Sequence, residues 1–156
     1  MLGTAHKLRF REATSDDIAS IVRLLADDFL GQQREYLSEP LNENYLRAFR
    51  EIEADPNNEL IVAELDGKVI GTVQLVITPS LSYKGSKRSI VESVRVDSSL
   101  RGKGIGREMM LWAIERAKQR GCVSMHLTSH NDRADAHRFY ESLGFAKSHT
   151  GMKKAL

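Results

Sequence analysis

The sequence predicts an α/β fold, in which a mixed β-sheet carries helices on both of its faces. Strand-like runs gather in the middle of the chain on either side of Asp66-Gly67, a dipeptide typical of two-residue hairpin turns. A strand, a helix and another strand follow, which is the order of a unit with parallel strands. Where the pairing changes from antiparallel to parallel, such a sheet can splay and admit a ligand.

The N-terminal third is predicted to hold one strand and two helices. Residues 8–12 alternate between apolar and polar side chains, as a short strand does. Thr14-Ser15-Asp16-Asp17 then places a capping hydroxyl and carboxylates at a helix start, and apolar residues at helical spacing continue to about Phe29. Residues 30–40 are irregular, and a second helix is expected over residues 43–53.

The rest of the chain alternates strands and helices. Pro79 closes the second hairpin strand, a polar loop covers residues 83–88, and Gly121 ends the long helix that precedes it. The expected strands cover residues 60–65, 69–77, 89–96, 123–129 and 145–153, and the expected helices cover residues 104–120 and 134–143.

A glycine-rich run, Arg101-Gly102-Lys103-Gly104-Ile105-Gly106, lies between a predicted strand and the long helix. A turn that opens a helix in this way presents free backbone N–H groups and the positive end of the helix dipole to one point. Its glycines have no Cβ, so the backbone can approach a ligand closely and adopt positive φ without strain. Positive charge surrounds the same point on Arg101, Lys103 and Arg107. The run therefore predicts an anion site, most naturally for a phosphate or diphosphate.

Two familiar phosphate loops do not match this run. A Walker A loop needs Gly-Lys followed by Ser or Thr, but Gly104 follows Lys103. The dinucleotide fingerprint has the spacing G-x-G-x-x-G after the first strand of a βαβ unit, with an acidic residue about 20 positions later. Here the spacing is G-x-G-x-G, and Cys122-Val123-Ser124 stands at the acidic position.

A third pattern fits. Arg101-x-x-Gly104-x-Gly106 resembles the R/Q-x-x-G-x-G/A signature of the GNAT superfamily of acetyl-CoA-dependent N-acetyltransferases. Residues 136–145, a helix that ends in Tyr-x-x-x-Gly-Phe, resemble the second signature of that superfamily. The resemblance covers nearly the whole chain and implies one GNAT-like N-acetyltransferase domain over residues 1–156, with a splayed mixed sheet. It implies transfer of an acetyl group from acetyl-CoA to a primary amine of a small molecule, by direct attack within a ternary complex.

The resemblance also implies roles for individual residues. Backbone groups of the strand before the loop pair with the pantetheine arm, and a bulge directs an N–H at the thioester oxygen; Val94 and Val96 are the matching positions. Strand alternation would put Glu92 on the same face as both valines, and Glu92 is the candidate base for the amine proton, directly or through a water. Tyr140 matches the tyrosine that protonates the departing thiolate, for which a phenol of pKa about 10 is competent.

One position departs from the family pattern. In many members an Asn seven residues before the tyrosine contacts the coenzyme, and Arg133 stands there in this chain. With this Arg, residues 135–140 and the ending at 148–149 and 153–156, the chain is similar to bacterial aminoalkylphosphonate N-acetyltransferases. That similarity would imply an amine that bears an anionic group. The expected coenzyme-binding residues are Val94, Val96, Arg101, Gly102, Lys103, Gly104, Gly106, Arg107 and Arg133.

Structural explanations compete with several of these roles. Glu92 is equally a surface carboxylate that could pair with Arg88 or Arg95, and Tyr140 could be a half-buried helix residue that packs on Phe145. Both alternatives stay open at the level of sequence.

Other residues that invite a chemical role have ordinary explanations. His126 and His130 lie four residues apart on a predicted strand, about 13 Å, which is too far for one ion, so no metal is expected. Cys122 is expected to be small buried filler, and Trp112 is expected to belong to the core.

Composition sets the broad class of the protein. A chain of 156 residues, of which 41% are hydrophobic and 28% charged, has room for one well-buried core. A net charge of +2 and an aromatic content of 6% do not support nucleic-acid binding. No apolar run approaches the roughly 18 residues of a membrane span, and no membrane partner is expected. A single cysteine suits a reducing compartment, so the cytoplasm is the expected location.

The leading functional hypothesis is therefore an enzyme. The alternative is a non-catalytic domain that keeps the fold and binds acyl-CoA as a sensor or regulator. The acceptor amine does not follow from the sequence, because the expected substrate loops, residues 30–40 and 79–88, carry no specific signature. Small enzymes of the superfamily often pair, which leaves a homodimer open.

Overall fold

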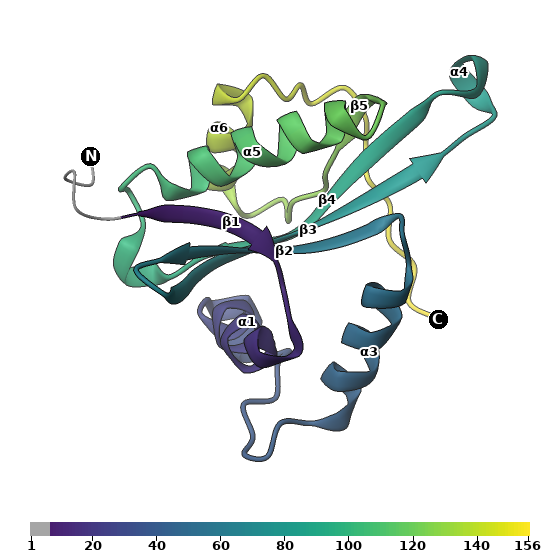
Figure 1. The fold of residues 1–156 in the computed structure, drawn as a ribbon. Coiled ribbons are helices and arrows are strands. Elements are labelled where there is room, and N and C mark those ends of the chain that lie inside the picture. The colour runs from purple at the N-terminus through teal and green to yellow at the C-terminus, as the bar shows by residue number, and fades with distance from the viewer. Residues whose placement is uncertain (1–6) are drawn as a thin grey trace. The chain divides into compact units, whose positions relative to one another are not determined.

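The computed structural model describes residues 7–156 (Figure 1). The chain forms two compact units, the first ending at His126 and the second running from Leu127 to Leu156. The strands of the first unit are β1 (Leu8–Glu12), β2 (Asn58–Leu65), β3 (Lys68–Pro79), β4 (Lys87–Val96) and β5 (Cys122–His126). Its helices are α1 (Ile18–Ala26), α2 (Phe29–Gln32), α3 (Glu43–Ala54), α4 (Ser82–Gly85) and α5 (Ile105–Gln119), with 3₁₀ turns η1 (Ser15–Asp17) and η2 (Ser98–Leu100). The second unit contains α6 (Ala134–Ser142).

The sheet is mixed, as predicted. Its strands lie in the order β1-β2-β3-β4-β5, and only the β4–β5 pair is parallel. The β2–β3 hairpin turns at Asp66 and Gly67, whose φ angles of 51° and 81° both lie in the left-handed region. Such a turn matches the twist of the flanking strands, which is why the Asp-Gly signal located this hairpin correctly.

Helices cover both faces of the sheet, which confirms the predicted fold class. Helices α1 and α3 lie on one face and α5 on the other (Figure 1). Thr72 of β3 lines a pocket with residues of α1 and α3. By contrast, a Cβ at its neighbour Gly71 would lie 3.4 Å from Met109 Sδ of α5. Successive residues of β3 therefore serve two separate apolar layers.

The first helix is shorter than predicted. Apolar periodicity extends to Phe29, but α1 ends at Ala26, and a separate short helix, α2, begins at Phe29. Asp28 has an extended backbone, and its carboxylate accepts a hydrogen bond from Gly31 N at 2.5 Å. A side chain that caps a new helix in this way competes with continuation of the old one.

Of the two strands predicted near the C-terminus, one is shorter than expected and the other is wrong. The strand expected over residues 123–129 ends at His126, and the one expected over 145–153 does not form in the described chain. All residues from Ala146 to Leu156 are exposed, so this segment has no buried face to specify its register.

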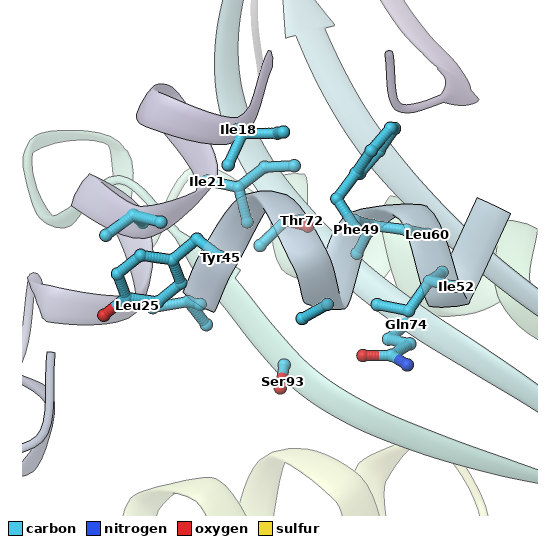
Figure 2. Close-up of a pocket in the computed structure, with 12 residues that line it drawn as sticks. Ile18, Ile21, Leu25, Tyr45, Phe49, Ile52, Leu60, Thr72, Gln74 and Ser93 are labelled. Atoms are coloured by element: carbon cyan, nitrogen blue, oxygen red, sulfur yellow. The ribbon is translucent and has the colours of Figure 1, made fainter. Parts of the chain in front are cut away.

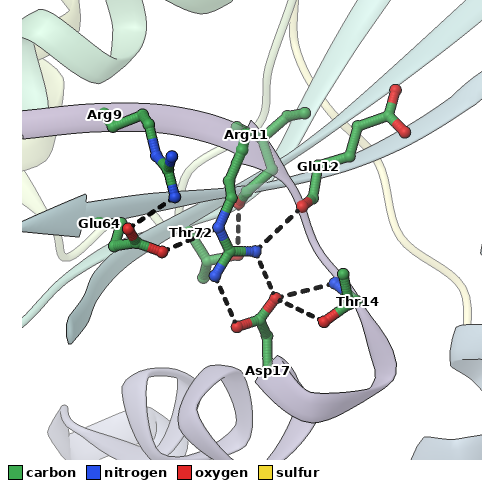
Figure 3. Close-up of polar contacts among 8 residues, drawn as sticks. Arg9, Arg11, Glu12, Thr14, Asp17, Glu64 and Thr72 are labelled. Atoms are coloured by element: carbon green, nitrogen blue, oxygen red, sulfur yellow. Dashed lines mark hydrogen bonds and ion pairs between the residues drawn. The ribbon is translucent and has the colours of Figure 1, made fainter. Parts of the chain in front are cut away.

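Arg11 holds the N-terminal end of the fold together (Figure 3). Its guanidinium donates to both carboxylate oxygens of Asp17, at 2.6 and 3.0 Å, and to Glu64 at 2.9 Å. Asp17 is buried, and it also accepts from the backbone N–H of Thr14 at 2.8 Å. The hydrogen bonds from Arg11 hold the pKa of Asp17 below its ordinary value. Strands β1 and β2 are thereby joined to the start of α1.

A second buried carboxylate joins β2 to the end of α5. Glu59 is 5% exposed and accepts from Arg116 at 2.8 and 3.0 Å, and it also pairs with Arg120. Burial by itself raises the pKa of Glu59, but the two guanidinium groups outweigh that effect and leave it lower than usual.

Acid should weaken the fold through these carboxylates. Because the folded-state pKa of Asp17 lies below its unfolded value, its contribution is present above the unfolded value and is lost as the pH falls through the folded one. Asp17→Asn should lower the free energy of unfolding near neutral pH by about 2 kcal/mol and should flatten its decline below about pH 4. Urea unfolding across a pH series measures both, and the exposed Asp16→Asn is the matched control. Identical pH dependence in the two variants would contradict this explanation.

Candidate functional site

Strands β4 and β5, the parallel pair at the edge of the sheet, are hydrogen-bonded over only the first part of β4. The ladder of β4 with β5 runs only from Lys87 to Ile90, whereas its ladder with β3 continues to Val96. In the described chain no other strand takes the place of β5 beside the second half of β4. This is the predicted splay. A strand edge without a ladder partner presents backbone donors and acceptors that an extended ligand can pair with.

A β-bulge interrupts the same half of β4. Glu92 stands opposite Gln74 and Arg95 opposite Thr72, so the two residues Ser93 and Val94 face the single residue between them on β3. Ser93 has a φ of 53°, in the left-handed region. An extra residue of this kind tilts the local N–H groups out of the ladder. The bulge implied by the family resemblance is therefore present, at Ser93-Val94.

The bulge overturns one prediction. Simple alternation put Glu92, Val94 and Val96 on one face, but the register pairs Glu92 with Gln74 and Val96 with Gly71. Gln74 lines the pocket beside α1 and α3, whereas Gly71 faces α5. Glu92 therefore lies on the α1/α3 face and Val96 on the α5 face. The inserted residue reverses which face of the sheet the following side chains of β4 point to, and no local sequence pattern predicts its position.

Glu92 is exposed. Arg95, which the sequence offered as a partner for Glu92, forms its ion pair with Asp28 instead. Arg95 Nε lies 3.5 Å from Asp28 Oδ2, and Arg95 Nη1 donates to the Val94 carbonyl at 2.9 Å. Asp28 is the residue that caps α2, so this ion pair ties the bulge region to the helix break after α1.

The glycine run forms an uncapped helix start. Gly102 and Gly104 have φ angles of 77° and 83°, which confirms the need for glycine at both positions. Gly104 is the N-cap of α5, and no side chain caps that end. A Cβ on either glycine would meet nothing within 4 Å, so the space in front of the loop is open. Gly106 differs, because it lies inside α5 with no positive φ.

Three cationic side chains lie near this helix start in the sequence, and one of them, Arg101, is hydrogen-bonded to Asp27. Arg101, Lys103 and Arg107 are all exposed. The guanidinium of Arg101 donates to the Asp27 carbonyl at 3.0 Å, and the Asp27 carboxylate accepts from Ser98 N and Oγ at 2.8 and 3.0 Å. The loop is thus fixed to the end of α1, a contact across some 70 residues that no local pattern predicted. Free N–H groups, a helix dipole and nearby cations fit a diphosphate.

A pocket of about 130 Å³ lies between α1, α3 and the sheet (Figure 2). Sequence reasoning missed it, because the apolar faces of both helices were assigned to the core and the substrate site to loops. Its lining residues are Ile18, Ile21, Val22, Leu25, Tyr45, Ala48, Phe49, Ile52, Leu60, Thr72, Gln74 and Ser93. The pocket reaches the bulge at Ser93.

The other predicted site residues belong to the second unit. Tyr140 lies in α6, with its ring 5.2 Å from that of Phe139 and 5.9 Å from that of Phe145. The packing on Phe145 weighed as an alternative is therefore real, and it orients the ring without using the hydroxyl. Arg133 is the N-cap of α6, where its carbonyl accepts from His137 N at 3.0 Å.

Cys122 and the metal-ligating side chains were the other candidates for a chemical role. Burial raises the pKa of the Cys122 thiol, which disfavours the nucleophilic thiolate. Within residues 7–156 no group of three or more metal-ligating side chains comes together. Trp112 is half-buried and stacks at 5.9 Å against Phe10 of β1. No helix among the described residues is both long and apolar enough to cross a membrane.

Comparison with known proteins decides the family. The profile of the acetyltransferase (GNAT) family matches residues 18–145. The chain belongs to the GNAT family. This confirms both the resemblance drawn from the two motifs and the predicted enzyme class, an N-acetyltransferase.

Individual relatives span the whole length of this GNAT protein. It is 33% identical over 150 residues to the aminoalkylphosphonate N-acetyltransferase of Salmonella typhimurium, covering 94% of this chain and 90% of the relative. A solved structure from Bacillus halodurans C-125, described as a transcriptional regulator, is 49% identical with a TM-score of 0.93, over 96% of this chain and all of that one. A putative acetyltransferase from Agrobacterium tumefaciens is 28% identical with a TM-score of 0.85, over 95% and 99% of the two chains.

Replacing Gly104 by Asp should weaken coenzyme A binding about a hundredfold, because a carboxylate would face the phosphates at the helix start. Calorimetric titration measures the affinity. Gly85→Asp is the control for backbone strain, since Gly85 has a φ of 75° and equally open space around it. Equal affinity in the two variants would show that the glycine loop is not the phosphate site.

Proposed function

We propose that this GNAT protein transfers an acetyl group from acetyl-CoA to the primary amine of a small molecule. The observation that carries the proposal is the arrangement of β4 and α5 in the first unit. The unpaired edge of β4, its bulge and the uncapped start of α5 follow one another along 15 residues, from Val91 to Ile105. One extended ligand with a diphosphate at one end and a thioester at the other matches that order.

In this proposal acetyl-CoA is held mainly by backbone groups. The N–H groups at the start of α5 bind the diphosphate, with Lys103 and Arg107 adding charge from either side. The edge of β4 at Val94 and Val96 pairs with the pantetheine arm. The bulge aims an N–H at the thioester oxygen, where negative charge develops as the amine attacks. Gly102, Gly106 and Arg101 complete this part of the proposed coenzyme site. Arg133, in the second unit, is proposed as a coenzyme contact from its position in the family motif alone.

The amine needs a base, and Glu92 is the proposed one. An alkylammonium ion of pKa about 10 is mostly protonated near neutrality and must lose a proton before it attacks. Glu92 is exposed and lies on the α1/α3 face, next to the bulge. The proton passes to Glu92 directly or through a water. The proposed reaction proceeds by direct attack in a ternary complex, as the family resemblance implies. An acylated cysteine is not needed for it, and burial raises the pKa of the Cys122 thiol, which disfavours the nucleophilic thiolate.

Tyr140 is the proposed acid. It matches the tyrosine of the second family motif, and a phenol is acidic enough to protonate a departing thiolate, whose conjugate acid has a pKa near 8.5. Its ring is oriented by Phe139 and Phe145. The proposed location is the cytoplasm, where acetyl-CoA is made and a lone cysteine stays reduced.

A regulatory role is the second candidate. The solved relative from Bacillus halodurans is described as a transcriptional regulator. In this candidate the domain binds acyl-CoA as a sensor or regulator, without turnover. The two candidates share the coenzyme site and differ in whether thiol is released. They also differ in the need for Tyr140, whose hydroxyl matters only to turnover.

Tyr140→Phe separates the candidates. The protein with acetyl-CoA and a panel of small amines should release free thiol, and the variant should lower kcat about a hundredfold with coenzyme affinity unchanged. A thiol-reactive dye measures the rate, and Tyr83→Phe, on the exposed α4 turn, is the control. Coenzyme binding without thiol release from any amine would favour the regulatory candidate instead.

A further inference from the structure

We propose that the pocket between α1, α3 and the sheet takes an apolar substituent of the acceptor, so that this enzyme prefers primary amines carrying a short alkyl or aryl group. The inference rests on the proposed acetyl transfer and names the substrate class of that site. It is carried by the position, the lining and the size of the pocket.

The pocket extends from the bulge, where the proposed reaction takes place, to β2. On its sheet side it is lined by Leu60, Gln74 and Ser93, which come from β2, β3 and β4. Leu60 stands opposite Gln74, and Gln74 opposite Glu92. One end of the pocket is therefore at the bulge, on the face that carries Glu92. An amine nitrogen held there would direct its substituent across β3 toward β2, under α1 and α3.

The lining offers apolar surface and few polar contacts. The apolar contributions come from Ile18, Ile21, Val22, Leu25, Ala48, Phe49, Ile52 and Leu60. Its deeper polar side chains already have partners: Thr72 donates to the Ile61 carbonyl at 3.0 Å, Gln74 to Asn58 at 2.9 Å, and Tyr45 to Glu35 at 2.6 Å. Burial and the bond to Glu35 raise the pKa of Tyr45, so its phenol stays neutral.

No residue that lines the pocket is cationic. A phosphonate or carboxylate placed inside would lose its hydration and gain no charged partner among the lining residues, which disfavours an unpaired ion there. An apolar group instead gains free energy from each methylene that it buries. The pocket therefore selects against the anionic end of an aminoalkylphosphonate, although the relative from Salmonella typhimurium is named for that substrate.

Size and access suit a small substituent. The volume of about 130 Å³ is close to the roughly 150 Å³ of an engineered apolar cavity that binds benzene. Ala48 and Ser93 are exposed, so the pocket opens to solvent and is not a sealed packing defect. Groups from propyl to phenyl fit this description.

A homologous series of amines tests the proposal. From ethylamine to pentylamine, kcat/KM should rise about fourfold per methylene until the pocket is filled, and benzylamine should rank with the best. Aminomethylphosphonate and aminoethylphosphonate should be poorer than alkylamines of equal length. If kcat/KM did not depend on chain length, or was higher for the phosphonates, the pocket would not be the binding site for the substituent, and acetyl transfer itself would still stand.

The same amines, tested by thermal shift with coenzyme A bound, distinguish the pocket from the chemistry. Shifts that grow with chain length in the absence of thiol release would support the pocket and contradict acetyl transfer. If the shifts in melting temperature did not depend on chain length, the pocket would not be the binding site for the substituent, whether or not thiol is released.

Matched variants on α3 localise the effect. Ala48→Phe should fill the mouth of the pocket and raise KM for pentylamine about tenfold, with coenzyme affinity unchanged. Arg47→Phe adds the same ring to the neighbouring exposed position, which does not line the pocket, and should leave KM unchanged. Ile52→Ala should enlarge the pocket and shift the optimum to a longer amine. Equal effects of Ala48→Phe and Arg47→Phe would overturn the assignment.

Discussion

Strand β4 has hydrogen-bonded partners on both edges for only part of its length, and most of the site follows from that constraint. Up to Ile90 it pairs on both sides, and beyond Ile90 only β3 remains beside it. Where the second partner is lost, the strand can accommodate an extra residue, and the bulge at Ser93-Val94 occurs there. One edge of β4 is thereby available to a ligand, while the bulge turns Glu92 and Ser93 toward the pocket side. The coenzyme and acceptor sides of the proposed reaction meet at this point.

The residues at the break between α1 and α2 fix both the proposed coenzyme loop and the bulge beside the pocket. Asp28 caps α2 and pairs with Arg95 beside the bulge, and Asp27 binds Ser98 and Arg101 of the glycine loop. The same helix, α1, lines the pocket. Two adjacent carboxylates thus hold the proposed diphosphate loop, the bulge and the acceptor pocket in register. Further from the site, the buried pairs of Asp17 and Glu59 fasten β1, β2 and the helices of both layers.

The sequence predicted those features that short local patterns encode. Asp66-Gly67 located the hairpin because both residues adopt left-handed angles, and Gly102 and Gly104 located the loop for the same reason. The pocket escaped prediction, since it depends on which helix faces lie together. The family resemblance implied the bulge, but no local pattern placed it at Ser93-Val94 or showed that it would move Glu92 away from the face of Val96. Alternation placed Glu92 with Val96 and was wrong by one inserted residue. The last strand expected at 145–153 does not form, because an unburied segment has nothing to fix its register.

The central claim is that the amide groups at the start of α5 bind the diphosphate of coenzyme A and so place the thioester beside the bulge. Calorimetric titration of the wild-type protein with coenzyme A and with pantetheine, which shares the arm but lacks the diphosphate, tests it most directly. We predict that coenzyme A binds at least about a hundredfold more tightly. No heat from coenzyme A with folded protein, or equal affinity for the two ligands, would contradict the claim.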